Sequence, residues 1–406
     1  MKAAWVGVWA GIWIAAVPAG GRAAYPQTLT TTTPFLNLPR PTDDPRWKEA
    51  FAHWDRREDT AEVMQALARV EALARDYPDR AVVQVWLARV TFMAGIRTKN
   101  DLPRQVEWMK KSVAAADKAL ALEPDNGFAR YWRYCAMAFY HAFTPQEFAE
   151  IRGFGAKYRH LRELPAPDDD LLWAAALSHW DQRLDRGESL KAIAGFEQLE
   201  KKYPARIEPK LWLMRVNYWM HYISPTEEEK ARWAKIAAEW GKQALAIEPR
   251  NPSANYLTAA SYGMYATHTS FLNYVRYALE IVERLTVVME EDPNYFYGGC
   301  SQYFALAIAR AGSLVSRSIG VAGFSEEVIV RNTVFASHYE PGYLRNHLAL
   351  GEMYLAQGKT EEGRKMLEKV LRSDPTELKN MEPENRVAQD LARELWAEHF
   401  PGQTPP

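Results

Sequence analysis

The chain of 406 residues contains two related copies of one block. The motif His-Trp-Asp occurs at residues 53–55 and again at residues 179–181, a shift of 179 − 53 = 126 positions. Arg89 and Arg215 are related by the same shift. Internal periodicity is typical of repeat proteins, in which each unit packs on its neighbours and the stack presents a surface. The duplication therefore favours a binding or scaffold protein.

The sequence predicts helices almost throughout. Apolar residues recur with helical spacing, as in the set Val63, Ala66, Leu67 and Val70, and no segment alternates as a strand does. A proline closes most of the predicted helices because it lacks the backbone N–H and disfavours helical geometry in the residue before it. These breaks are Tyr77-Pro78, Glu123-Pro124, Tyr203-Pro204, Glu248-Pro249, Asp292-Pro293, Glu340-Pro341 and Asp374-Pro375.

The last interval between these prolines, 375 − 341 = 34 residues, equals the tetratricopeptide period. We therefore predict an all-α fold, a tetratricopeptide-like superhelical array of antiparallel helix pairs over residues 46–400. The duplicated blocks span about 46–140 and 172–265, and the C-terminal part spans 266–400. A final helix at residues 384–399 is expected to cap the array with its charged side chains in water.

The two ends of the chain are predicted to lie outside this array. Residues 1–23 have a lysine, an apolar run and small residues in the order typical of a signal peptide, and the run is shorter than the ~20 residues of a membrane-spanning helix. No cysteine for a lipid anchor lies nearby, so the sequence predicts a periplasmic or secreted protein that does not span the membrane after cleavage. Residues 24–45 are expected to be an extended Thr- and Pro-rich lead-in, and residues 401–406 a disordered tail.

Composition and motifs disfavour several functions. Lys plus Arg (50) and Asp plus Glu (51) nearly cancel, so no positive field attracts nucleic acid. No catalytic, nucleotide-binding or zinc motif is present, so we expect a protein that is not an enzyme and has no cofactor or metal. His53 and His179 are duplicates of one another and are interpreted as structural. Cys135 and Cys300 are interpreted as two separate buried residues, with a disulfide as the alternative.

Repeat geometry suggests a binding groove. Counting from each proline, the positions that line the concave face of such arrays are predicted to include aromatic residues next to an arginine in each copy. The candidates are Arg89, Phe92 and Tyr131 in the first copy and Arg215, Tyr218, Trp219 and Tyr256 in the second. Each arginine could bind a carboxylate of a ligand or of a partner through two parallel hydrogen bonds. The alternative is that each arginine pairs with an acidic residue of a neighbouring helix.

One segment lies outside the duplication and is more specific. Residues 292–299 read Asp-Pro-Asn-Tyr-Phe-Tyr-Gly-Gly, Gln-Tyr-Phe follows at 302–304, and residues 381–388 read Met-Glu-Pro-Glu-Asn-Arg-Val-Ala. Over about residues 286–400 the chain resembles the T component of TRAP transporters. The resemblance implies a periplasmic tetratricopeptide-type protein that assists solute uptake, with a solute-binding protein as its partner.

The same segment adds candidate ligand-binding residues, namely Tyr295, Tyr297, Gln302 and Tyr303. The pair Gly298-Gly299 predicts either a turn or a close approach of the backbone to a ligand. A small anionic or hydrophobic ligand and an oligomer both fit the sequence. The alternative function is a periplasmic adaptor that docks proteins during assembly of the cell envelope.

Overall fold

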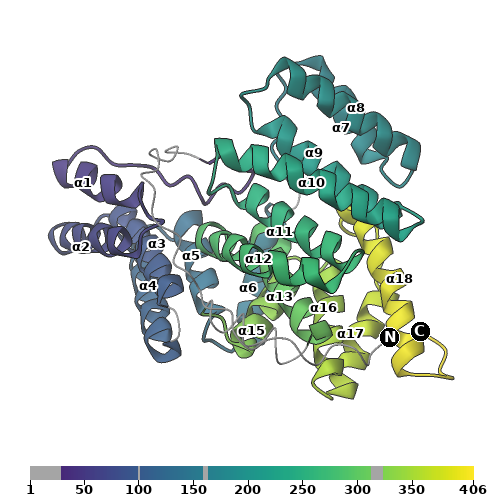
Figure 1. Ribbon diagram of the computed structural model, residues 1–406. Helices are drawn as coiled ribbons and strands as arrows, with labels where there is room; N and C mark the ends of the chain where they lie inside the picture. Colours follow the sequence, from purple (N-terminus) through teal and green to yellow (C-terminus); the bar gives the residue numbers. More distant parts are fainter. Residues whose placement is uncertain (1–28, 99–100, 159–162, 312–322) are drawn as a thin grey trace.

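The protein is described here from a computed structural model that defines residues 29–98, 101–158, 163–311 and 323–406 (Figure 1). Within these ranges the regular structure consists of seventeen α-helices and one 3₁₀-helix, and no strand is present. The predicted all-α array of helix pairs is confirmed. The expected signal peptide lies outside the described residues. None of the described helices is long and apolar enough to cross a membrane.

The two copies form the same five helices in the same order. The first copy contains α1 (Pro45–Trp54), α2 (Thr60–Asp76), α3 (Ala81–Arg97), α4 (Leu102–Leu122) and α5 (Gly127–Met137). The second contains α7 (Leu171–Asp181), α8 (Arg186–Lys202), α9 (Glu208–Ile223), α10 (Glu227–Ile247) and α11 (Pro252–Thr267). Between them lies α6 (Pro145–Ala156), and after them come α12 (Phe271–Glu291), α13 (Tyr295–Ala311), α15 (Glu326–Tyr339), α16 (Leu344–Ala356), α17 (Thr360–Arg372), η1 (Lys379–Met381) and α18 (Glu382–His399).

In each copy the first helix begins at an aspartate that forms the same hydrogen bonds. Asp44 caps α1 and accepts a hydrogen bond from Tyr77 at 3.1 Å, and Asp170 caps α7 and accepts one from Tyr203 at 3.0 Å. Side-chain caps of this kind satisfy N–H groups that the helix itself leaves unpaired. The duplicated sequence thus encodes duplicated local structure.

The duplicated histidines belong to this repeated structure. His53 lies 2.5 Å from Glu62, and His179 lies 2.6 Å from Glu188 at the equivalent place. Among the described residues no group of three or more His, Cys, Asp or Glu side chains has the arrangement of a metal site. Both histidines therefore occupy the structural position that the duplication indicates.

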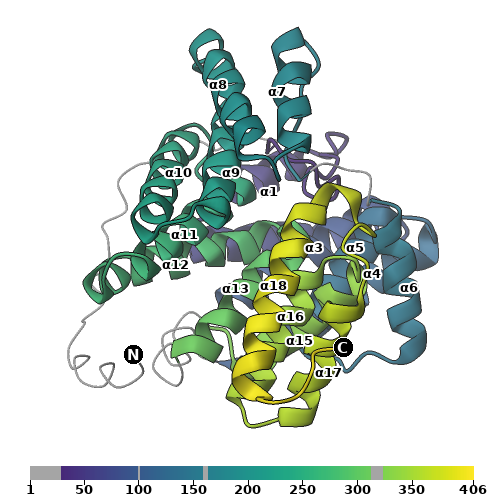
Figure 2. The same ribbon diagram turned by 90° about the vertical axis from the view of Figure 1, so that its right-hand side faces the viewer.

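The array is not a simple stack in which each pair contacts only its neighbours. Consecutive helices do pack on one another, but α12 also packs on α3, and α6 packs on α15. In both views α7 and α8 project from one side of the molecule (Figures 1 and 2). Of the C-terminal helices, α15 lies beside α6. The chain therefore folds back, so that its C-terminal helices cover surfaces that an open superhelix would leave exposed.

The lead-in also covers later helices. Residues 29–44 contain no helix, and Phe35 and Leu38 are buried. The Thr30 N–H donates to Glu248 at 3.0 Å, and the Thr33 hydroxyl donates to Asp292 at 2.7 Å. These contacts join positions more than 200 residues apart, so we call residues 29–44 the strap.

The C-terminal helix has the expected exposed face and an unexpected buried one. Arg386, Asp390 and Glu394 are exposed, as predicted for a cap, but Glu384 in its first turn is buried. The segment expected to be a disordered tail contacts this helix, because the backbone carbonyl of Gln403 accepts a hydrogen bond from Trp396 at 3.0 Å. Cys135 and Cys300 are both buried and free, in agreement with their interpretation as separate residues.

Candidate functional site

The duplicated arginines lie in buried ion pairs. In the first copy Arg57 and Arg89 bind Glu291, the last residue of α12, at 2.8 and 3.0 Å. Arg250 binds the same carboxylate at 2.5 Å and also binds Glu290 at 2.6 Å. We call Arg57, Arg89, Arg250 and Glu291 the first clamp.

The second copy repeats the arrangement with a different carboxylate. Arg183 binds Glu384 of α18 at 2.6 Å, and Arg215 donates to the same side chain. Glu163, from the segment before α7, lies 3.4 Å from Arg215. We call Arg183, Arg215 and Glu384 the second clamp.

Burial and charge together set the protonation of both clamps. Burial alone would raise the pKa of Glu291, but Arg57, Arg250 and Arg89 hold it well below its usual range. Burial also raises the pKa of Glu384, but Arg183 and Arg215 outweigh it and lower that pKa to about 2. Both glutamates are therefore ionised at neutral pH, and each neutralises part of the buried positive charge.

These pairs change the interpretation of the predicted groove. Arg89 and Arg215 are only 3% and 2% exposed, and carboxylates of the same chain already contact them, which is the alternative weighed from the sequence. Phe92 and Trp219 are 0% exposed. The expectation of an open aromatic groove at these positions is wrong, because the folded-back helices fill the concave face. Ligand binding by these residues stays a prediction.

The remaining candidates gather around the start of α13. Tyr131, Tyr256, Tyr295 and Gln302 are buried, and Tyr297 and Tyr303 are partly buried. Tyr131, Tyr295 and Tyr297 line one cavity, with a volume of about 80 Å³. Since a single water molecule needs about 10–15 Å³ by such a measure, this space holds several waters or a small molecule.

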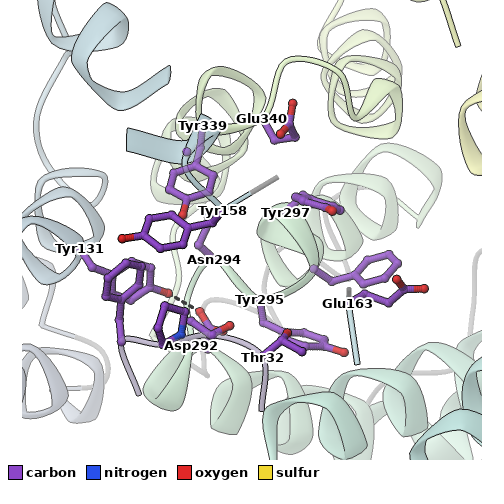
Figure 3. A pocket seen from close by; sticks show the side chains of 15 residues that line it. Thr32, Tyr131, Tyr158, Glu163, Asp292, Asn294, Tyr295, Tyr297, Tyr339 and Glu340 are labelled. Atoms are coloured by element: carbon purple, nitrogen blue, oxygen red, sulfur yellow. Dashed lines mark hydrogen bonds between the residues drawn. The ribbon is translucent and has the colours of Figure 1, made fainter. Parts of the chain in front are cut away.

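The cavity is partly open and is lined by the strap, by the segment before α7, by α5 and by the ends of α6, α12, α13 and α15 (Figure 3). Tyrosine hydroxyls and carboxylates surround it, and the dashed line in Figure 3 marks the bond from Tyr131 to Asp292. Its lining residues are Thr32, Thr33, Pro34, Phe35, Tyr131, Gly155, Tyr158, Glu163, Asp292, Asn294, Tyr295, Phe296, Tyr297, Tyr339 and Glu340.

A left-handed turn forms one wall of the cavity. Phe296, Tyr297 and Gly298 have φ angles of 51°, 57° and 77°, a conformation that costs roughly 1–2 kcal/mol for each residue other than glycine. A side chain at Gly298 would also lie 2.3 Å from Ala336, and one at Gly299 would lie 2.8 Å from the Tyr256 ring. The glycine pair thus provides both a turn and a close packing contact. Strain of this kind is concentrated at functional sites.

Within the described residues, three buried polar atoms at the cavity form no hydrogen bond. They are the amide oxygen of Asn294, the hydroxyl of Tyr295 and the carboxylate oxygen of Glu163 that is ion-paired with Arg215 at 3.4 Å. Buried polar groups in native proteins are nearly always paired, so unpaired groups beside a cavity point to a ligand or to ordered water. Asp292 differs, since Tyr131 and Thr33 already donate to it, and burial raises its pKa.

A second hollow lies between α4, α5 and α6 and is larger, about 620 Å³. Its charged groups include the exposed pair of Arg133 and Asp117, 2.6 Å apart. None of its lining residues has a buried polar atom without a partner. The smaller cavity beside the left-handed turn is therefore the better candidate site.

Sequence reasoning found part of this cavity. It selected Tyr295 and Tyr297 because they lie in the specific segment outside the duplication. It missed the strap threonines, Glu163 and Glu340. An acidic residue before a proline was visible at Glu340, but that pattern was interpreted only as a helix end. Glu163 has no signal in the sequence, because its role depends on how the chain folds back.

Comparisons with known proteins give little further information. Neither the family models nor the curated proteins give a match. Among solved structures, the monomeric mutant of IFIT1 with Gppp-AAAA is 14% identical, with 80% of this chain and 71% of that chain covered and a TM-score of 0.32. Yeast Tom70 is 12% identical, with 87% and 97% covered and a TM-score of 0.20. Because both TM-scores are low, the description of the fold rests on the helices themselves.

Proposed function

We propose that this protein is a non-catalytic, exported helical-repeat protein that holds a small molecule in the cavity beside the left-handed turn. The observation that carries the proposal is that the buried Asn294 amide oxygen and Tyr295 hydroxyl form no hydrogen bond within the described residues and lie beside a partly open cavity. Small-ligand sites are concave, with a few placed polar groups on a rigid scaffold. The Asn294 amide oxygen only accepts hydrogen bonds, so the ligand is one that donates them, such as an amine or a hydroxyl compound.

The finer part of the proposal is an accessory role in a TRAP-type solute uptake system. It is supported by the resemblance over residues 286–400, a region that includes the left-handed turn and Glu384 of the second clamp. In that role the partner is a periplasmic solute-binding protein. The export signal predicted at residues 1–23 supports the location.

The test uses the full chain, expressed with its own leader and purified from the periplasmic fraction. Native mass spectrometry should show one additional small mass that disappears when the protein is denatured. Tyr295→Phe together with Asn294→Leu should lose that mass, since these changes remove two of the unpaired groups. Tyr354→Phe, a tyrosine outside the cavity, is the matched control and should keep it. A wild-type protein that is always free of ligand would contradict the proposal.

One observation favours the adaptor function instead. The projecting pair α7 and α8 exposes Leu171 to 89% and also exposes Leu184 and Leu190. A contiguous exposed apolar patch is typical of a docking surface, and exposed leucines on a projecting helix pair are the places where such a patch would be sought. A pull-down from the periplasm separates the two functions. Capture of a solute-binding protein supports the uptake role, and capture of envelope-assembly factors by a ligand-free protein supports the adaptor.

A further inference from the structure

Arg345, in the first turn of α16, differs from the arginines of the two clamps. Its side chain is partly buried, and within the described ranges no carboxylate lies within ion-pair distance of it and no hydrogen bond is formed by it. Its guanidinium lies over the ring of Tyr222, 4.9 Å from the ring centre. A guanidinium that lies on a ring face and not on a carboxylate keeps its N–H groups available to an anion.

Tyrosines surround this guanidinium. The hydroxyls of Tyr218 and Tyr222, one turn apart near the end of α9, lie 2.9 Å from each other. Burial raises the pKa of Tyr218, Tyr256 and Tyr343, and the positive charge of Arg345 opposes the shift at each. The tyrosines are therefore neutral hydroxyl groups within electrostatic reach of a charged arginine.

The cluster lies on the other side of one aromatic side chain from the cavity. Phe296 lines the cavity and also packs on Tyr256 and Tyr343, with ring centres 5.5 and 5.8 Å away. The nearby cation of α13, Arg310, binds Glu352 through two contacts of 2.9 Å. Since Glu352 is occupied in this way, it does not neutralise Arg345.

The first copy shows that the repeat does not require these hydroxyls. At the shift of 126, Tyr218 corresponds to Phe92 and Tyr222 corresponds to Ile96. Both residues of the first copy are fully buried and apolar. The last two turns of α9 therefore carry two hydroxyls that α3 lacks, and the Tyr222 ring lies beneath the Arg345 guanidinium.

We propose that Arg345, Tyr218 and Tyr222 bind the carboxylate group of a small organic acid. A guanidinium presents two N–H groups that match the two oxygens of a carboxylate, and tyrosine hydroxyls add further donors. A carboxylate carries one negative charge, which one arginine balances, whereas phosphate carries nearly two. This site is additional to the cavity of the proposed function.

The test is isothermal titration calorimetry of the full protein with acetate, benzoate and succinate, in a buffer without other carboxylates. Inorganic phosphate and sulfate are titrated in separate arms. We expect at least one carboxylate to bind, Arg345→Met to abolish that binding, and Arg345→Lys to weaken it by about tenfold or more. Changing Tyr218→Phe and Tyr222→Ile together gives α9 the residues of α3 and should also weaken binding by about tenfold.

Controls separate a loss of binding from a loss of folding. Arg372→Met, on the exposed face of α17, should bind as the wild type does. Without ligand, Arg345→Met should melt at the wild-type temperature or above, because it removes an uncompensated charge. Tyr295→Phe should keep the carboxylate affinity, so the result does not depend on the cavity ligand. The proposal is overturned if no carboxylate binds, if only phosphate or sulfate binds, or if Arg345→Met binds as tightly as the wild type.

Discussion

The two copies of the block have the same five helices and equivalent capping contacts, but the arginines of their clamps bind different glutamates. In the first copy Arg57 and Arg89 share Glu291 with Arg250, and the carboxylate comes from the end of α12. In the second copy the equivalent arginines share Glu384 from the start of α18.

The difference shows that the duplication determines the local structure of each copy, whereas the contacts of each copy with the helices outside the duplication do not follow the repeat. Glu291 and Glu384 are 384 − 291 = 93 positions apart, so they do not follow the repeat shift. Each clamp attaches a duplicated unit to a helix outside the duplication. The fold-back of the array is therefore held by buried charge as well as by apolar packing.

The largest expected effect comes from breaking the first clamp. Glu291→Gln should lower the free energy of unfolding by about 3–5 kcal/mol, because three buried arginines lose a shared negative charge. Glu384→Gln should cost less, since Glu163 remains 3.4 Å from Arg215. Urea denaturation followed by circular dichroism measures both. Equal losses, or a larger loss at Glu384, would show that the two clamps do not differ as described.

The next largest effect on stability is expected at the left-handed turn of residues 296–298, which lies outside the duplicated blocks. Gly298→Ala should lower the free energy of unfolding by about 2 kcal/mol or more, because it combines a left-handed φ with a side chain 2.3 Å from Ala336. Gly153→Ala in α6 is the matched control, since no atom lies within 4 Å of its added carbon. It should be neutral or slightly stabilising. Similar losses in both variants would argue against strain at the turn.

Acid should weaken both clamps over a defined range. The folded-state pKa of Glu384 is about 2, below the 4.5 of an unperturbed glutamate, so its contribution is complete above pH 4.5 and is lost as the pH falls toward 2. The pKa of Glu291 is also lowered, so Glu291 also loses its stabilising contribution in acid. The pKa of Asp292 is raised, so Asp292 has the opposite effect on stability. Melting temperatures from pH 6 to pH 3 should fall less steeply for Glu384→Gln than for the wild type. If the melting temperature falls equally steeply with pH in both proteins, Glu384 does not contribute to the loss of stability in acid.

The smallest effect is expected where the copies are alike. His53→Ala and His179→Ala should each change the melting temperature by less than about 2 °C, because ion pairs that water still reaches contribute little. Differential scanning calorimetry of both variants provides the comparison. A large loss at one histidine alone would mean that the two sites are not equivalent.

The sequence predicted the features that depend on local pattern. Helical spacing, proline breaks and the 126-residue shift were sufficient for the helices, the exposed cap residues and the structural interpretation of His53 and His179. The pairing of Arg89 and Arg215 with acidic residues was weighed as an alternative, but their partners could not be named. Glu291 and Glu384 come from unduplicated helices, and only the folded chain brings them to the arginines.

Only part of the candidate site was predicted, because the rest depends on contacts that form when the chain folds. Tyr295 and Tyr297 were selected from a specific segment, but the left-handed conformation of Phe296 and Tyr297 has no local signal, because only glycine favours it. Arg345 was missed, since an arginine in a helix has no motif. Only the folded chain shows that, among the described residues, its guanidinium lies on the Tyr222 ring and on no carboxylate.

The central claim is that buried unpaired groups beside the left-handed turn hold a small molecule. A crystal structure of the protein purified from the periplasmic fraction tests it most directly. We predict electron density for one small molecule in the cavity, within hydrogen-bond distance of the Asn294 amide oxygen and the Tyr295 hydroxyl. A cavity filled only by water, in protein that has not been exposed to denaturant, would contradict the account.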